Sequence, residues 1–194
     1  PDNVRSAMTV RVGGCSESPF NQNNLALHVG DTAADVQANR DALETTLNLS
    51  RSPVWLNQVH GTKVIYAPNA KGVPDADGSF SDQSGVPCVV LTADCLPVLL
   101  CDPNGTQIAA IHAGWRGLAN GILRRTVIQF SSTKNILAYL GPAIGPQAFE
   151  VGVDVREAFL SNAQDSVHQS AIKNAFIGAS AKYLADIYAL ARAE

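Results

Sequence analysis

Two residues near the middle of the chain, Cys95 and His112, are of the types that combine in nucleophilic catalysis and in metal binding. A cysteine beside a histidine can act as an activated thiol, and the same two side chains are common zinc ligands. Asp94 places a charge directly before Cys95, in a stretch that is otherwise apolar. For any one Cys and one His the usual alternative is a structural pair in the core, so their relative position matters.

The segment between these two residues predicts a β-hairpin that brings them together. Residues 96–101 and 106–112 are apolar runs, and Asp102-Pro-Asn-Gly105 between them has the residues that a type I turn prefers. An antiparallel hairpin closed by these four residues places Cys95 directly opposite His112. Opposed side chains lie on one face with Cβ atoms about 4.5–5.5 Å apart, near enough to share a proton or a metal ion. A bulge in the first strand would shift the register by one residue and separate them.

The residues after His112 indicate a binding site for an anion. Gly114 and Gly117 open an expected helix over about residues 118–130. The free N–H groups at a helix start attract anions, and Arg116 could add a forked pair of donors for phosphate or carboxylate. The alternative for Arg116 is a solvated surface arginine.

The elements that must position these residues include strands, hairpins and helices. Short apolar runs predict further strands at residues 54–56, 64–66, 89–91 and 136–140. Helical periodicity predicts helices at residues 33–47, 154–161 and 182–193, the first preceded by a sequence resembling a capping box, Thr32-Ala-Ala-Asp35. Residues 68–87 are rich in Pro, Gly, Asp and Ser and predict a loop. This order favours an α/β domain of α+β type, with a mixed sheet flanked by helices, over a doubly wound parallel sheet.

Size and composition are those of one globular domain spanning residues 1–194. Charged residues make up 16% of the chain, the formal net charge is -3, and no block of basic residues suggests a nucleic-acid partner. The absence of a secretory signal and of a long apolar span predicts a cytoplasmic protein without a membrane segment, whose cysteines are reduced. Because the chain begins at Pro1 and ends at Glu194 within a helical pattern, we expect a piece of a longer protein.

Four sequence blocks together resemble one known family. They are Val59-His-Gly61, Thr92-Ala-Asp-Cys-Leu-Pro97, His112-Ala-Gly-Trp-Arg-Gly117 and Leu140-Gly-Pro-Ala-Ile-Gly145. Asn24-Leu25, His28-Val-Gly-Asp31, Ala76-Asp77 and Tyr183-Leu-Ala-Asp-Ile-Tyr188 extend the match over nearly the whole chain. The chain resembles the laccase-domain (YfiH-like) family of purine nucleoside phosphorylases, formerly called multicopper polyphenol oxidases.

The resemblance implies a fold, a metal site and a set of activities. The fold is a mixed β-sheet sandwich flanked by helices, related to the toxin deamidases that use a Cys–His pair. The metal site is a zinc site formed by His60, Cys95 and His112. The activities are phosphorolysis of adenosine, inosine, guanosine and methylthioadenosine, and deamination of adenosine. Some bacterial members also resemble peptidoglycan editing factors that act on muropeptide precursors. The resemblance also implies that a C-terminal segment usual in the family is missing from this chain, which stops at Glu194.

Each implied activity assigns roles to particular residues. Three protein ligands leave one zinc position open, as in catalytic sites, and that position supplies the activated water that deamination needs. Phosphorolysis needs an oriented phosphate, for which Arg116 is the first candidate and Arg11 a weaker one. Asp77 is a candidate acid–base group, with a turn-forming Asp before Gly78 as the alternative. Asn24 is a candidate substrate-binding residue.

Three alternatives concern the same residues. A single bound copper is compatible with the ligand set, but the four histidines, including His28 and His168, are too few for a blue site and a further copper cluster. Cys95 could instead be a metal-free nucleophile activated by His112. The cluster could also be a structural zinc site in a binding protein, which would require a fourth ligand such as His168 or Cys15. His28 is otherwise expected to be structural.

Overall fold

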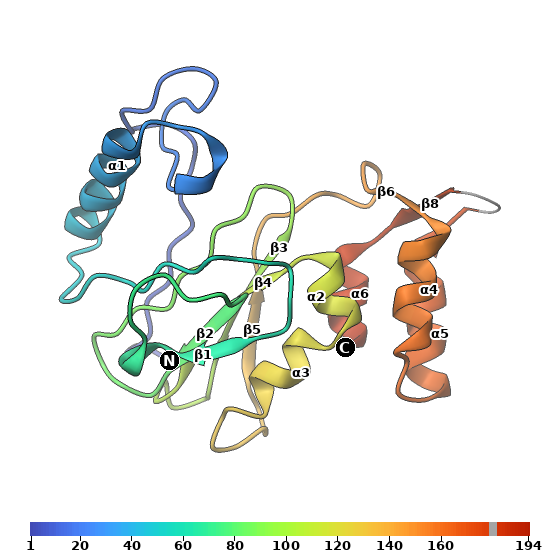
Figure 1. The fold of residues 1–194 in the computed structure, drawn as a ribbon. Helices are drawn as coiled ribbons and strands as arrows, with labels where there is room; N and C mark the ends of the chain where they lie inside the picture. The colour runs from blue at the N-terminus through green and yellow to red at the C-terminus, as the bar shows by residue number, and fades with distance from the viewer. Residues whose placement is uncertain (179–181) are drawn as a thin grey trace.

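The computed structural model describes residues 1–178 and 182–194 and contains two β-sheets (Figure 1). The larger sheet has five strands in the order β1-β2-β4-β3-β5. These are β1 (Val64–Tyr66), β2 (Gly78–Ser81), β3 (Leu96–Cys101), β4 (Ile108–Ala113) and β5 (Leu137–Leu140). Strand β1 runs parallel to β2, and the other neighbours are antiparallel, so the sheet is mixed as expected.

The predicted hairpin is confirmed, but its predicted register is wrong by two residues. The observed pairing sets Pro97 opposite His112, and the connection contains six residues (102–107) instead of four. The Asp102 carboxylate explains the longer loop, because it accepts hydrogen bonds from the backbone N–H groups of Thr106 and Gln107, each at 2.6 Å. Since side chains alternate with a period of two, a shift by two residues leaves Cys95 on the same side of the sheet as His112.

Two short helices cover one face of this sheet and bury its apolar side chains. They are α2 (Trp115–Ala119) and α3 (Ile122–Val127), which occupy the region where we expected one continuous helix. The break falls at Gly121, whose φ of 83° is a left-handed conformation that favours glycine. The core between helices and sheet includes Val98, Ile111 and Ile122, each at most 2% exposed. His112 lies on the opposite face of the hairpin, where it is also buried.

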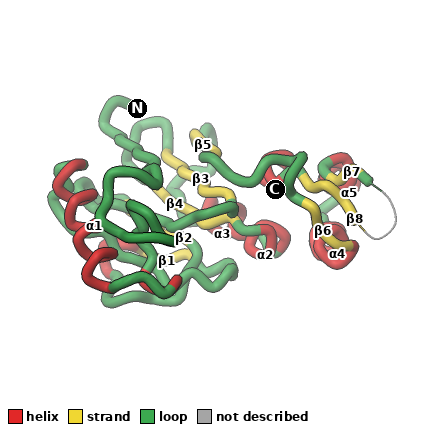
Figure 2. Tube along the Cα trace, turned by 90° about the horizontal axis from the view of Figure 1, so that it is seen from above, coloured by secondary structure: helices red, strands yellow, loops and turns green. Residues whose placement is uncertain are grey.

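The C-terminal region forms a second sheet of three strands in the order β6-β8-β7, and Figure 2 shows the two sheets as separate groups of strands. Its elements are β6 (Glu150–Gly152), α4 (Val153–Ser161), α5 (Ser166–Asn174), β7 (Phe176–Ile177), β8 (Lys182–Ala185) and α6 (Ile187–Ala193). The expected helix at 154–161 is confirmed. The helix expected over 182–193 is wrong in its first half, because β8 pairs with both β6 and β7. Asp186 then caps α6 by accepting from the N–H of Tyr188 and Ala189.

The N-terminal region contains α1 (Ala33–Thr46) and the short 3-10 turn η1 (Leu27–Val29), and a second 3-10 turn, η2 (Ala67–Asn69), follows β1. The helix confirms the expectation, but the Thr32 side chain makes no capping bond. The inner face of α1 buries Val36 together with two polar side chains. Asn39 bonds the backbone of Cys15 and Asn24, and Arg40 bonds the carbonyl of Leu25. Helix α1 therefore anchors the preceding loop through hydrogen bonds.

Two further corrections concern the strands. Residues 54–56 and 89–91, expected to be strands, are irregular, whereas β2 lies within the expected loop 68–87.

No helix among residues 1–178 and 182–194 has the length and apolarity needed to cross a membrane.

Candidate metal centre and active site

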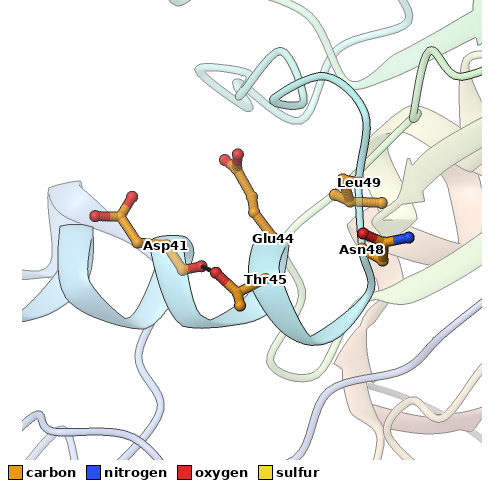
Figure 3. A pocket seen from close by; sticks show the side chains of 5 residues that line it. All are labelled: Asp41, Glu44, Thr45, Asn48 and Leu49. Atoms are coloured by element: carbon orange, nitrogen blue, oxygen red, sulfur yellow. Dashed lines mark hydrogen bonds between the residues drawn. The ribbon is translucent and has the colours of Figure 1, made fainter.

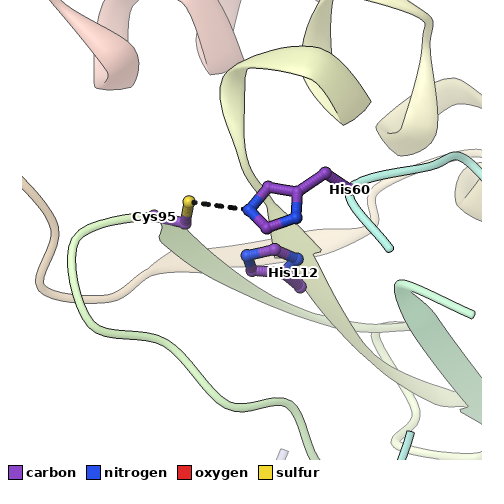
Figure 4. Close-up of side chains that lie close together, drawn as sticks. All are labelled: His60, Cys95 and His112. Carbon is purple, nitrogen blue, oxygen red and sulfur yellow. Dashed lines mark hydrogen bonds between the residues drawn. The ribbon is translucent and has the colours of Figure 1, made fainter. Parts of the chain in front are cut away.

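Within the described part of the chain, one group of three or more potential metal ligands lies close together: His60, Cys95 and His112. One ligand atom from each residue lies within 4.8 Å of the others. Cys95 Sγ is 3.9 Å from His60 Nε2, and the two imidazole rings are 4.7 Å apart and nearly perpendicular (Figure 4). The geometry thus brings together the three residues that the sequence resemblance implied.

The three side chains come from different segments and differ in burial. Cys95 directly precedes β3, His112 lies in β4, and His60 lies in the loop before β1. His112 is only 4% exposed, Cys95 is half-buried, and His60 is exposed. The cluster is therefore closed on the His112 side and accessible to solvent on the His60 side.

The Asp77 carboxylate contacts both histidine segments. Its Oδ1 lies 2.9 Å from His112 Nδ1 and accepts a hydrogen bond from the His60 backbone N–H at 2.8 Å. Its Oδ2 accepts from the N–H of Gly61 at 2.7 Å and of Val59 at 3.3 Å. Asp77 is fully buried and lies in a bend directly before β2.

These contacts explain the titration behaviour of the site. Burial opposes ionisation of Asp77, but hydrogen bonds from His112 and the backbone of Gly61 and His60 hold its pKa below the ordinary 3.8. Burial alone would lower the pKa of His112, but its bonds to Asp77 and Cys95 raise it to about 9. Burial, together with the charge of the adjacent His112, lowers the pKa of His60. The two imidazoles are thus electrostatically different.

Close backbone approach around the cluster requires glycine at two positions. A Cβ on Gly114 would lie 3.1 Å from both Cys95 Sγ and His60 Cδ2. A Cβ on Gly117 would lie 2.9 Å from the carbonyl oxygen of Gly61. Gly114 and Gly117 therefore let the His60 loop and the start of α2 meet beside Cys95. Gly114 opens α2 as expected, whereas Gly117 lies inside this helix of five residues.

The segment carrying Cys95 is held by residues that the sequence did not single out. The Gln58 side chain forms two 2.7 Å hydrogen bonds with the backbone of Leu91, which joins the His60 loop to the Cys95 segment. The N–H of Ile144 donates to the carbonyl of Asp94 at 2.9 Å. Tyr188 from α6 fixes this second loop, since its hydroxyl accepts from Ala143 N–H at 2.8 Å. For Tyr188, the sequence signal that could have indicated this role is its position in the Tyr183–Tyr188 block that resembles the family.

The other expected site residues lie in different surroundings. Arg116 is exposed and stacks on the Trp115 ring at 4.3 Å, and its charge contributes to lowering the pKa of His60. The expected role of Arg116 in holding phosphate stays a prediction. Asn24 bonds Asp31 at 2.9 Å and Arg11 bonds the Asn21 carbonyl at 3.4 Å, so the recorded contacts of both lie in the N-terminal loops.

Residues considered as a fourth ligand do not join the cluster in the described chain. Cys15 lies against α1, with Sγ 3.4 Å from Asn39 Oδ1, and His168 in α5 accepts a hydrogen bond from the N–H of Gln164. His28 is exposed in η1. The three-ligand arrangement thus has the composition of a catalytic rather than a structural zinc site.

Two surface hollows lie apart from the ligand trio. One is a groove of about 480 Å³ between the β3–β5 edge and α3. The other, of about 370 Å³ at the end of α1 (Figure 3), is lined by Asp41, Glu44, Thr45, Asn48 and Leu49. Neither contains a cluster residue.

The cluster fits a zinc ion in donor type and in spacing. Cys sulfur and His nitrogen are the preferred zinc donors, and ligand atoms of a tetrahedral zinc site lie about 3.3–3.6 Å apart. The 3.9 Å separation of Cys95 Sγ and His60 Nε2 is close to this value. The missing side chain at Gly114 leaves room beside Cys95 Sγ and the His60 ring. Residues His60, Cys95 and His112 would therefore hold the ion after small inward shifts.

Comparison with known proteins identifies the family. A sequence model described as multi-copper polyphenol oxidoreductase laccase matches residues 5–194. The protein named purine nucleoside phosphorylase YfiH of Escherichia coli K12 is 49% identical over 198 residues, covering 99% of this chain and 77% of that protein. Purine nucleoside phosphorylase PA4543 of Pseudomonas aeruginosa is 47% identical over 195 residues, with the same coverage.

Solved structures show the same architecture. Neisseria meningitidis protein NMB0706 matches with a TM-score of 0.86 and 48% identity, over 94% of this chain and 73% of that chain. A Bacillus licheniformis hypothetical protein YfiH matches with a TM-score of 0.82 and 26% identity, over 93% of this chain and 72% of that chain. These neighbours confirm the expected mixed α+β fold. The chain belongs to the multi-copper polyphenol oxidoreductase laccase family.

Proposed function

We propose that this protein is a zinc-dependent purine nucleoside phosphorylase that also deaminates adenosine. The observation that carries the proposal is the convergence of His60, Cys95 and His112 in a chain 49% identical to a protein named purine nucleoside phosphorylase. When bound, the zinc ion would supply Lewis acidity at the position that its three protein ligands leave open. The protein side chains around that position would then bind and orient the substrate.

Phosphorolysis places defined demands on the surrounding residues. An oxygen of phosphate forms a bond to C1′ of the ribose while the bond from C1′ to the purine nitrogen breaks, and the departing purine takes up a proton. Arg116 is exposed beside His60 and offers a forked set of N–H donors, so we assign it to hold the phosphate. Because the guanidinium remains charged, it also offsets the negative charge of the nucleophile. Arg11 and Asn24 remain proposals for the more distant parts of the substrate.

Deamination of adenosine uses the same metal site, with water in place of phosphate. Water adds to the purine carbon that carries the amino group, and ammonia leaves to give inosine. The open fourth position favours this second activity, since a closed structural site would offer no place for water.

Zinc is favoured over a multi-copper centre by the number of ligands. Within the described residues His28 and His168 lie outside the cluster, so the histidines do not converge on a second group of metal ions. A single copper at the same three residues is the alternative, and metal analysis of the purified protein separates the two. As a metal ligand Cys95 binds as a thiolate and is not free to act as a nucleophile.

The decisive experiment is product analysis with adenosine, with and without phosphate, on zinc-loaded protein. Adenine and ribose 1-phosphate should form only with phosphate, whereas inosine should form in both conditions. His60→Gln should lose both products, and His28→Gln, an exposed histidine outside the cluster, should retain them. Formation of neither product by the zinc-loaded protein would contradict the proposal and favour the alternative activity on muropeptide precursors.

A further inference from the structure

The geometry points to Asp77 as a positioning residue that sets the arrangement of two metal ligands at once. This inference rests on the proposed metal site and replaces the acid–base role first expected for Asp77. The carboxylate is 0% exposed, and both of its oxygens are used by protein donors. A group so enclosed has no free oxygen with which to exchange a proton with substrate.

The contact with His112 fixes the ring of that ligand. Asp77 and His112 face each other at the ends of β2 and β4, where the His112 N–H donates to the Asp77 carbonyl at 2.7 Å. Their side chains share one face, and Oδ1 lies 2.9 Å from Nδ1. Because an ionised carboxylate can only accept, Nδ1 must carry the proton. The Nε2 atom is then the one left for the metal, on the side toward Cys95.

The contact with the His60 segment fixes the backbone of the second ligand. His60 has a φ of 58°, a left-handed conformation that is unfavourable for a residue with a Cβ. The Asp77 carboxylate accepts from the successive N–H groups of Val59, His60 and Gly61 and thereby compensates for this cost. Successive N–H groups that surround an anion in this way form a nest.

A single substitution separates this role from simple packing. In Asp77→Asn the volume is retained, but one oxygen becomes an NH₂ group that cannot accept a hydrogen bond. The amide can serve the His112 ring or the Gly61 N–H, but not both, so at least one ligand segment loses its support. Loss of such a supporting contact lowers metal affinity by about 10–100-fold.

The test measures zinc affinity by competition with a chelator, using purified wild type, Asp77→Asn and a matched control. Asp75→Asn is the control, because Asp75 is an exposed carboxylate two residues away that bonds the Asn57 side chain. We expect a loss of about 10–100-fold for Asp77→Asn and unchanged affinity for Asp75→Asn. Equal affinity of wild type and a folded Asp77→Asn would overturn the inference.

A second measurement on wild-type protein applies even if Asp77→Asn does not fold. In zinc-loaded protein a slowly exchanging imidazole N–H proton should appear at low field in the NMR spectrum, and His112→Gln should remove it. An Nδ1 without a proton would overturn the positioning role while leaving measured zinc binding, and hence the proposed function, intact. A wild type that binds no zinc would overturn both, which distinguishes the two failures.

Discussion

Gly114 is the position where a single added methyl group should disturb the ligand cluster most directly. The Cβ of Gly114→Ala would lie 3.1 Å from Cys95 Sγ and 3.1 Å from His60 Cδ2, both well inside van der Waals contact. The backbone at Gly114 has φ −66° and ψ 159°, which alanine adopts freely, so the effect is steric alone. Relief requires the Cys95 and His60 side chains to move by a few tenths of an ångström, whereas zinc–ligand distances vary by only about 0.2 Å.

We therefore expect Gly114→Ala to weaken zinc binding by about 5–150-fold, which corresponds to the 1–3 kcal/mol that overpacking usually costs. Isothermal titration of metal-free protein with zinc measures the loss. Gly145→Ala is the matched control, because its Cβ would meet nothing nearer than Gln147 Oε1 at 3.7 Å. Wild-type zinc affinity in a correctly folded Gly114→Ala would refute the proposed arrangement of ligands.

Three further predictions address phosphate, pH and loop stability. Arg116→Ala should reduce phosphorolysis more than deamination, because only phosphorolysis consumes an anion, and equal losses in steady-state assays would contradict this role. Burial raises the pKa of Glu194 from 4.5 to about 7, so folding stability should fall, by at most about 3 kcal/mol, as pH rises from 4.5 to 7. Thermal melting should show that Glu194→Gln gains stability over wild type at pH 8 but not at pH 4, and a pH-independent difference would count against this account. Tyr188→Phe removes the hydroxyl that bonds the 141–144 loop and should lower the free energy of unfolding by about 1 kcal/mol in urea titration, whereas no change would argue that the bond is dispensable.

Much of the site follows from local patterns in the sequence. The turn residues and apolar runs predict the hairpin. Because the predicted register is wrong by two residues, an even number, Cys95 and His112 still lie on one face. The register itself depends on the Asp102 carboxylate, which accepts hydrogen bonds from the N–H groups of Asn104, Thr106 and Gln107 and so extends the loop. Such side-chain bonds to the backbone are difficult to anticipate from residue types, because a shorter turn satisfies the same preferences.

The rest depends on contacts between distant segments. His60 was assigned through the family resemblance, since a His in a loop has no periodicity that would place it beside Cys95. Strand β2 is short and contains small residues, so its identity as a central strand comes from pairing with β1 and β4. The same holds for β8, where pairing with two neighbours outweighs a local pattern compatible with a helix. The acceptor role of Asp77 could not be predicted without β2.

The most direct test of the central claim is the activity of one protein sample before zinc removal, after rigorous chelation, and after zinc is restored. The account predicts about one zinc per chain, loss of ribose 1-phosphate formation without zinc, and recovery with it. Cys95→Ala should neither bind zinc nor turn over adenosine, whereas Cys15→Ala, an exposed cysteine outside the cluster, should do both. Full activity of the zinc-free protein, abolished by a thiol-alkylating reagent, would contradict the metal site and establish Cys95 as a nucleophile paired with His112.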